Sequence, residues 1–111
     1  MREIKPDDLD EMIENHDAPL IVDARSADEF ARAHIPGALH LPADAMQNAA
    51  DPQGGARLAR DDARGIVVYS NRGVRSATAA AELDRMGFAN VYSLAGGIEQ
   101  WRRAGMAVVS G

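Results

Sequence analysis

The sequence predicts an α/β fold with a central, mostly parallel sheet and helices on both of its faces. Two apolar runs, residues 20–22 and 66–69, have the composition of buried strands, and helical patterns lie between and beyond them. This short-range alternation of strand and helix is typical of parallel strands joined by crossover helices. A chain of 111 residues is long enough for one such domain and too short for two. We therefore expect a single domain over residues 1–111.

The first part of the chain is predicted to hold two helices and two strands. These are a helix over 6–13, a strand over 20–22, a helix over 26–33 and a small strand over 39–41. Ser26 and Glu29 have the spacing of a capping box, which indicates where the second helix begins. Pro36 and Gly37 break both regular patterns, so a turn is expected there.

The second part of the chain is predicted to alternate strand and helix twice. The expected elements are strands over 66–69 and 91–93 and helices over 75–86 and 98–103. The strand over 66–69 is the clearest, because it is uninterrupted and rich in β-branched residues. Gly87 suits the left-handed residue that follows a helix. Residues 48–64 show no clear period, and could hold a short helix and a loop.

Composition and charge exclude several classes of partner and site. The formal net charge is -5 and the isoelectric point is about 5.0, so neither nucleic acid nor an anionic membrane is expected as a partner. The sequence contains no cysteine, which excludes disulfides and thiolate metal sites. The N-terminal residues lack an apolar signal region, and no apolar run is long enough to span a membrane. We expect a cytoplasmic monomer or weak dimer.

The segment with the clearest chemical content joins the strand over 66–69 to the following helix. Such a loop directs several backbone N–H groups towards one point, and the helix dipole favours negative charge there. Gly73 allows the backbone to turn tightly, while Arg72 and Arg75 bring positive charge to an acidic protein. The loop therefore predicts a site for a small oxyanion.

Four segments resemble, in the same order, the signatures of the rhodanese family of sulfurtransferases. They are Val68–Ser76, which is similar to the active-site loop; Val22–Arg25 with Glu29–Phe30; His34–Ala38 with His40–Pro42; and Gly87–Trp101. The resemblance covers nearly the whole chain and implies a rhodanese-like fold. It implies a small sulfur-containing anion or a sulfur-carrier protein as partner, with no metal and no organic cofactor.

The departure from the family lies at the reacting atom. Members use a cysteine that takes a sulfane sulfur from a donor such as thiosulfate, becomes a persulfide and passes the sulfur to an acceptor. The resemblance places Ser70 at that position, so the chain is expected to be inactive in sulfur transfer. It implies anion binding by Asn71, Arg72, Gly73, Val74, Arg75 and Ser76. Asp23, Arg25, Glu29 and His34 are expected to support the site structurally.

Other interpretations remain open from the sequence. The chain could be a natural non-catalytic module that binds an anion or a partner protein, and either natural divergence or a deliberate Cys→Ser exchange would give Ser70. A phosphatase of the same fold ranks third, because four residues separate Ser70 from Arg75 and those enzymes have one more. A serine nucleophile would need His34 or His40 with Asp23 as partners.

Several residues also have structural interpretations. Asp23 and Arg25 are expected to tie the strand over 20–22 to the next helix, and Arg25 could pair with Glu29. His34 and His40 are expected in turns and packing, and Trp101 as a core anchor for the last helix.

Overall fold

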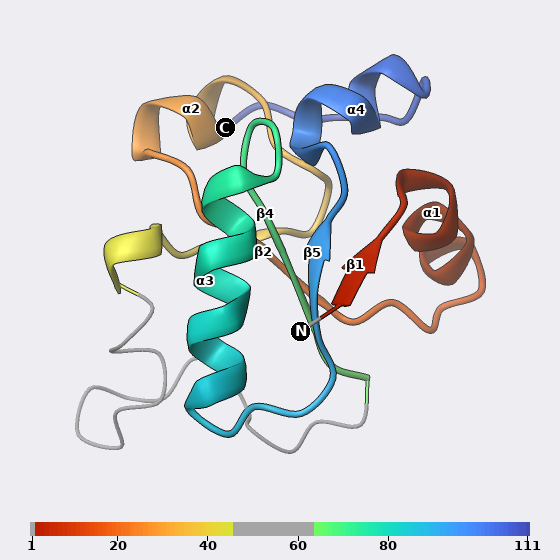
Figure 1. The fold of residues 1–111 in the computed structure, drawn as a ribbon. Helices are drawn as coiled ribbons and strands as arrows, with labels where there is room; N and C mark the ends of the chain where they lie inside the picture. The colour runs from red at the N-terminus through yellow and green to blue at the C-terminus, as the bar shows by residue number, and fades with distance from the viewer. Residues whose placement is uncertain (1, 46–63) are drawn as a thin grey trace.

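The computed structural model describes residues 2–45 and 64–111, and places five strands in one sheet (Figure 1). The strands are β1 (Arg2–Ile4), β2 (Leu20–Asp23), β3 (Leu39–His40), β4 (Ile66–Tyr69) and β5 (Val91–Leu94). Their order is β1-β5-β4-β2-β3, and each neighbouring pair is parallel. The helices are α1 (Pro6–Glu14), α2 (Ala27–Arg32), α3 (Val74–Arg85) and α4 (Gly97–Arg103). The predicted α/β fold with a parallel sheet is confirmed.

The central strand β4 shows why the sheet needs helices on both faces. Ile66 and Val68 pack into a cluster with α3, whereas Val67 and Tyr69 pack into a second cluster with α1 and α4. Successive side chains of a strand point to opposite faces, so an unbroken apolar strand must be covered twice. All four residues of β4 are buried, which accounts for the clarity of the pattern in the sequence.

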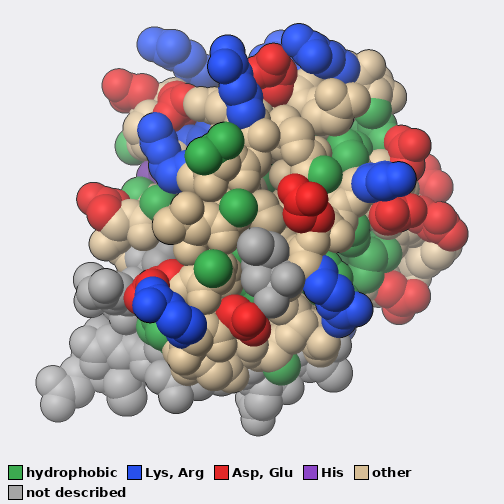
Figure 2. All heavy atoms as spheres, in the orientation of Figure 1, with side chains coloured by type: hydrophobic (Ala, Val, Ile, Leu, Met, Phe, Trp, Pro, Cys, Tyr) green, Lys and Arg blue, Asp and Glu red, His purple; other side chains and the backbone are tan. Residues whose placement is uncertain are grey.

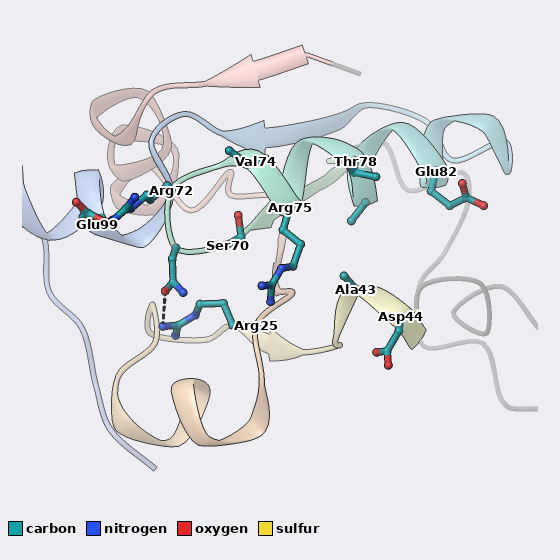
Figure 3. Close-up of a pocket in the computed structure, with 12 residues that line it drawn as sticks. Arg25, Ala43, Asp44, Ser70, Arg72, Val74, Arg75, Thr78, Glu82 and Glu99 are labelled. Carbon is teal, nitrogen blue, oxygen red and sulfur yellow. Dashed lines mark hydrogen bonds and ion pairs between the residues drawn. The ribbon is translucent and has the colours of Figure 1, made fainter.

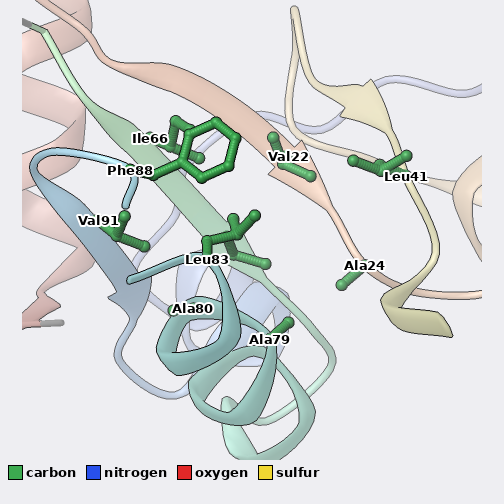
Figure 4. Close-up of a cluster of buried hydrophobic side chains, with 10 residues drawn as sticks. Val22, Ala24, Leu41, Ile66, Ala79, Ala80, Leu83, Phe88 and Val91 are labelled. Carbon is green, nitrogen blue, oxygen red and sulfur yellow. The ribbon is translucent and has the colours of Figure 1, made fainter. Parts of the chain in front are cut away.

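Each face of the sheet has its own apolar core. Figure 4 shows the α3 face, where Ala79, Ala80 and Leu83 of the helix meet the strands. On the other face, Trp101 of α4 is 2 % exposed and its indole N–H donates to the carbonyl oxygen of Ala107 at 2.9 Å. The expectation that Trp101 anchors the last helix is confirmed.

One strand was missed by the sequence analysis. β1 has only three residues, two of them exposed and charged, so it carries no apolar run. It forms by pairing with β5, where Ile4 lies opposite Leu94. Because it is an edge strand, its charged side chains can stay in solvent. Smaller differences concern boundaries: α3 begins at Val74 rather than Arg75, and β3 ends at His40 rather than Leu41.

The irregular stretch predicted over 48–64 lies outside the described residues except for Arg64. Among the helices that the structure describes, none is long and apolar enough to cross a membrane. Figure 2 shows acidic side chains gathered at the right of the molecule, where α1 lies, and basic ones along the upper edge near α2 and α4. On the face shown, acidic and basic side chains therefore lie over different elements.

The fold brings the polar residues of interest to one edge. Because all the strands are parallel, their carboxyl ends share that edge, and ligands of open α/β sheets bind there. Asp23 is the last residue of β2, Ser70 follows β4, and Gly96 follows β5 by two residues.

Candidate functional site

The site is built around the hydroxyl of Ser70. Its Oγ accepts hydrogen bonds from the backbone N–H groups of Gly73, at 3.2 Å, and Ser76, at 3.1 Å. Gly73 precedes α3 with a φ of 97°, a left-handed conformation that glycine adopts without strain. Ser70 is 4 % exposed, and none of the described residues accepts a bond from its hydroxyl proton. The hydroxyl oxygen therefore occupies the point on which the loop N–H groups converge, and its proton is available for a further hydrogen bond.

The start of α4 holds the loop in place through hydrogen bonds to its carbonyl oxygens. The N–H of Ile98 donates to the carbonyl oxygen of Ser70 at 2.9 Å, and the N–H of Glu99 donates to that of Asn71 at 3.1 Å. A Cβ at Gly97 would lie 2.4 Å from the Ser70 carbonyl oxygen, so the two backbones touch. This close approach fixes the carbonyl side of the loop, while its N–H side faces Ser70 Oγ.

A pair of buried hydroxyls supports the same loop from inside the sheet. Ser76 and Ser93 have no exposed surface, and their Oγ atoms are 2.8 Å apart. Ser76 Oγ also donates to the carbonyl oxygen of Gly73 at 3.2 Å. Sequence reasoning missed Ser93; the available signal was a serine in the centre of an apolar strand, where a buried hydroxyl needs a partner.

A buried charged group lies behind the loop, at the ends of β2 and β4. Asp23 accepts hydrogen bonds from the backbone N–H and side chain of Arg25, including Nη2 at 2.8 Å, and from the hydroxyl of Tyr69 at 2.6 Å. Burial, and then the bond to Asp23, raise the pKa of Tyr69, so the phenol stays protonated. Burial lowers the pKa of Arg25, but Asp23 outweighs it and the net pKa is raised.

Arg25 links the buried carboxylate of Asp23 to the loop. Its Nη2 donates to the carbonyl oxygen of Ala33 just after α2, as expected for a residue that ties β2 to that helix. Its Nη1 donates to Asn71 Oδ1 at 3.3 Å, the bond drawn as a dashed line in Figure 3. Asn71 in turn donates to Glu29 at 2.5 Å. The pairing of Arg25 with Glu29 is wrong, because the guanidinium takes Asp23 as its ion partner.

Glu29 joins the loop to the cap of α2. The capping box with Ser26 is confirmed, with the Ser26 side chain accepting from the Glu29 N–H and the Glu29 side chain accepting from the Ser26 N–H. The bond from Asn71, and then those from Ser26, lower the pKa of Glu29 to about 2. The carboxylate is therefore ionised at neutral pH.

The two histidines lie near the site without reaching Ser70. His34 stacks on Phe30 with ring centroids 3.9 Å apart, and its Nδ1 bonds the carbonyl oxygen of Phe30 at 2.8 Å. His40 Nε2 bonds the carbonyl oxygen of Arg25 at 2.8 Å. Both have the packing role expected of them, and neither forms the hydrogen bond to Ser70 that a serine nucleophile requires.

An open pocket borders the loop, between α3 and the turn that follows β3 (Figure 3). Its volume is about 910 Å³. Its lining residues are Arg25, Ala43, Asp44, Ser70, Asn71, Arg72, Val74, Arg75, Thr78, Ala79, Glu82 and Glu99. Gly73 and Ser76 act through their backbone N–H groups instead.

The side chains of the predicted loop differ in what they contact. Arg72 is largely exposed and pairs with Glu99 at 3.3 Å. Val74 is 79 % exposed at the start of α3. Arg75 lines the pocket and has no ion-pair or hydrogen-bond partner among the residues described here. Of the two loop arginines, Arg75 is therefore the one without a partner among the described residues.

Comparison with known proteins agrees with this architecture. Residues 5–104 match the model of the family described as "Rhodanese-like domain". The chain is 33% identical over 110 residues to a protein named "Sulfurtransferase" from Allochromatium vinosum, covering 99% of this chain and 96% of that protein. It is also 33% identical over 100 residues to a tRNA uridine(34) hydroxylase from Yersinia pestis. There it covers 90% of this chain and only 28% of the relative.

Solved structures give the same fold. A rhodanese-related protein from Thermoplasma volcanium superposes with a TM-score of 0.83 at 28% identity, over 100% of both chains. A protein from Rhodopseudomonas palustris, described as a possible tyrosine phosphatase, superposes with a TM-score of 0.86 at 26% identity. That match covers 98% of this chain and 85% of the other.

Proposed function

The chain belongs to the rhodanese-like domain family, and we propose that it binds a small oxyanion at Ser70 without forming the persulfide of an active sulfurtransferase. Ser70 then stands where active members have their nucleophilic cysteine. The donor or ligand is a small sulfur-containing anion, free or presented by a sulfur-carrier protein. A cytoplasmic location and a monomeric or weakly dimeric state belong to the same proposal.

The position of Ser70 Oγ carries this proposal. Two backbone N–H groups converge on it at the N-terminus of α3, an arrangement that stabilises negative charge. Here the two N–H groups are bonded to a neutral hydroxyl. The hydroxyl proton and the free guanidinium of Arg75 are then the donors that an incoming oxyanion meets.

Serine cannot replace cysteine in the covalent step. A thiol with a pKa of about 8.5 is readily ionised by a helix N-terminus and N–H donors. A hydroxyl is far more basic, and the same donors leave it protonated. In an active member the thiolate attacks the outer sulfur of thiosulfate, the S–S bond breaks, and sulfite leaves with the bonding electrons. With no cysteine in the sequence, no other thiol in the chain can take this role.

Restoring the cysteine tests the assignment directly. We expect no thiosulfate:cyanide sulfurtransfer above background for the chain with Ser70, and clear turnover for Ser70→Cys. Ser110→Cys, at an exposed position outside the pocket, is the control for the reactivity of any thiol. Turnover by the chain with Ser70 contradicts the proposal. If Ser70→Cys and Ser110→Cys are both folded by circular dichroism and both give only background rates, the loop is not a sulfurtransferase loop that lacks only its cysteine.

Direct binding tests the anion half of the proposal. We expect thiosulfate to bind the chain at low ionic strength, as measured by calorimetry or NMR shifts of the Gly73 and Ser76 amides. Arg75→Gln is expected to weaken binding about five- to thirtyfold, because a charged hydrogen bond is worth about 1–2 kcal/mol. Arg102→Gln, which removes the same charge from α4 outside the pocket, is the control.

A phosphatase remains the less favoured alternative. Four residues lie between Ser70 and Arg75, which leaves less room for a phosphoryl group than the longer phosphatase loop. The likeness to the structure described as a possible tyrosine phosphatase is why the alternative is tested. Ser70→Cys is expected to leave p-nitrophenyl phosphate intact, and hydrolysis of that ester would reverse the ranking.

A further inference from the structure

The charges lining the pocket are not all compensated within the protein. Three ion pairs neutralise most of them, namely Arg25 with Asp23, Arg72 with Glu99, and Glu82 with Arg85. Two side chains have no such partner among the described residues, Arg75 on α3 and Asp44 on the turn after β3. Figure 3 shows that Arg75 comes from α3 and Asp44 from the turn across the pocket from α3. The pocket therefore presents one free positive and one free negative charge.

The two charges lie at chemically different ends of the pocket. Arg75 and Ser70 both line the pocket; Ser70 is 4 % exposed, and its hydroxyl has a proton to donate. Figure 3 shows two short side chains, Thr78 and Ala43, between Arg75 and Asp44, and Ala79 also lines the pocket. The pocket volume of about 910 Å³ also far exceeds what one inorganic oxyanion fills. A ligand that only neutralises Arg75 leaves most of the pocket and Asp44 unused.

We propose that the pocket selects a bipolar ligand, with its oxyanion at Ser70 and Arg75 and a cationic group, such as an ammonium, at Asp44. A short body between the two charges lies along Ala43, Thr78 and Ala79. This inference rests on the proposed oxyanion site and adds the class of molecule that carries the anion: an amino-sulfonate or an amino-thiosulfonate rather than an inorganic ion. It assigns Asp44 the role of a specificity-determining residue.

Matched ligand pairs test the inference. Taurine and its longer ω-aminoalkanesulfonate homologues are titrated into the full chain by calorimetry, each against the alkanesulfonate of the same length without the amine. At low ionic strength we expect the amine to raise affinity about two- to fivefold at the chain length that spans the pocket, as expected for an exposed ion pair. The gain is expected to vanish in high salt.

Asp44→Asn is the informative variant, and Asp17→Asn is its matched control. Both remove one carboxylate from an exposed position, and Asp17 lies outside the pocket. We expect the amine-dependent gain to disappear in Asp44→Asn and to persist in Asp17→Asn. Plain alkanesulfonate binding is retained in both, because Ser70 and Arg75 are unchanged.

The outcomes separate this inference from the proposed function. If no sulfonate binds, the oxyanion site itself is overturned. If alkanesulfonates bind but the amine adds nothing at any length, the oxyanion site stands and the bipolar ligand is overturned. The bipolar ligand is also overturned if the gain survives Asp44→Asn, because the amine then contacts another group.

Discussion

Two loops at the carboxyl edge of the sheet have the same backbone design, but the N–H groups of their helices have different partners. Each joins a strand to a helix through a glycine in a left-handed conformation, Gly73 before α3 with φ 97° and Gly96 before α4 with φ 73°. Neither helix has a side-chain cap. At α3 the free N–H groups converge on Ser70 Oγ, whereas at α4 they bond the carbonyl oxygens of Ser70 and Asn71.

The difference shows how a helix N-terminus becomes available for binding. The first N–H groups of any helix need partners, and those of α4 are used up by the neighbouring backbone. Those of α3 meet only a small hydroxyl at the floor of an open pocket. The α4 loop therefore serves as structure for the α3 loop, and substitutions in the two should have different consequences.

The largest expected effect comes from removing the charge behind the α3 loop. Asp23→Ala leaves the buried guanidinium of Arg25 without its carboxylate and the Tyr69 hydroxyl without its acceptor. We expect a loss of about 3–5 kcal/mol in the free energy of unfolding, measured by urea denaturation. A loss below about 1 kcal/mol would show that the loop does not depend on this group. Asp28→Ala, an exposed acid in α2, is the control.

The next largest effect should distinguish the two glycine positions. A Cβ at Gly97 would meet backbone atoms of Ser70 and Asn71 at 2.4–2.5 Å, whereas at Gly73 the nearest atom is 3.3 Å away. We expect Gly97→Ala to cost about 2–3 kcal/mol and Gly73→Ala about 1 kcal/mol, both by thermal and urea denaturation. The reverse order would mean that the α4 loop yields more easily than the α3 loop.

A smaller effect is expected inside the sheet. Ser76→Ala leaves the backbone N–H that bonds Ser70 but removes the partner of the buried Ser93 hydroxyl. We expect a cost of about 1–2 kcal/mol, because an unsatisfied buried hydroxyl is unfavourable. The double variant with Ser93→Ala should recover part of this cost. Additive losses in the double variant would show that the two hydroxyls act independently.

The smallest effect concerns pH. The pKa of Glu29 is lowered from 4.5 to about 2 in the folded protein, so the ionised form favours folding above pH 4.5. This stabilisation is lost as the pH falls from about 4.5 to about 2. Because the group is partly exposed, we expect Glu29→Gln to differ from the parent by only about 0.5 kcal/mol at pH 7. The difference should shrink below pH 4.5 in pH-dependent urea melts; a constant difference contradicts the assignment.

Local patterns predicted the frame of the molecule well. Ser26 and Glu29 marked the start of α2, and the unbroken apolar run at 66–69 marked the central strand. Both signals arise from neighbours in the sequence. The edge strand β1 was not predictable in this way, because it pairs with β5, which lies at the far end of the chain.

The candidate site was predictable as a loop but not as a network. The strand, Gly73 and the arginines indicated an anion cradle around Ser70. The bond from Tyr69 to Asp23 spans 46 positions and leaves no local trace. For the same reason the sequence could not separate Arg72, which has Glu99 as a partner, from Arg75, which has no described partner.

The bonds between the start of α4 and the carbonyl oxygens of Ser70 and Asn71 also set an order of events during synthesis. Because β4 and α3 precede residues 97–99 in the chain, they emerge from the ribosome before the start of α4 does. Until then those two carbonyl groups lack the N–H donors of Ile98 and Glu99 that hold the loop in the folded protein. The loop that borders the pocket is therefore fixed only after the start of α4 has emerged, so binding competence depends on residues 97–99 as well as on the loop itself.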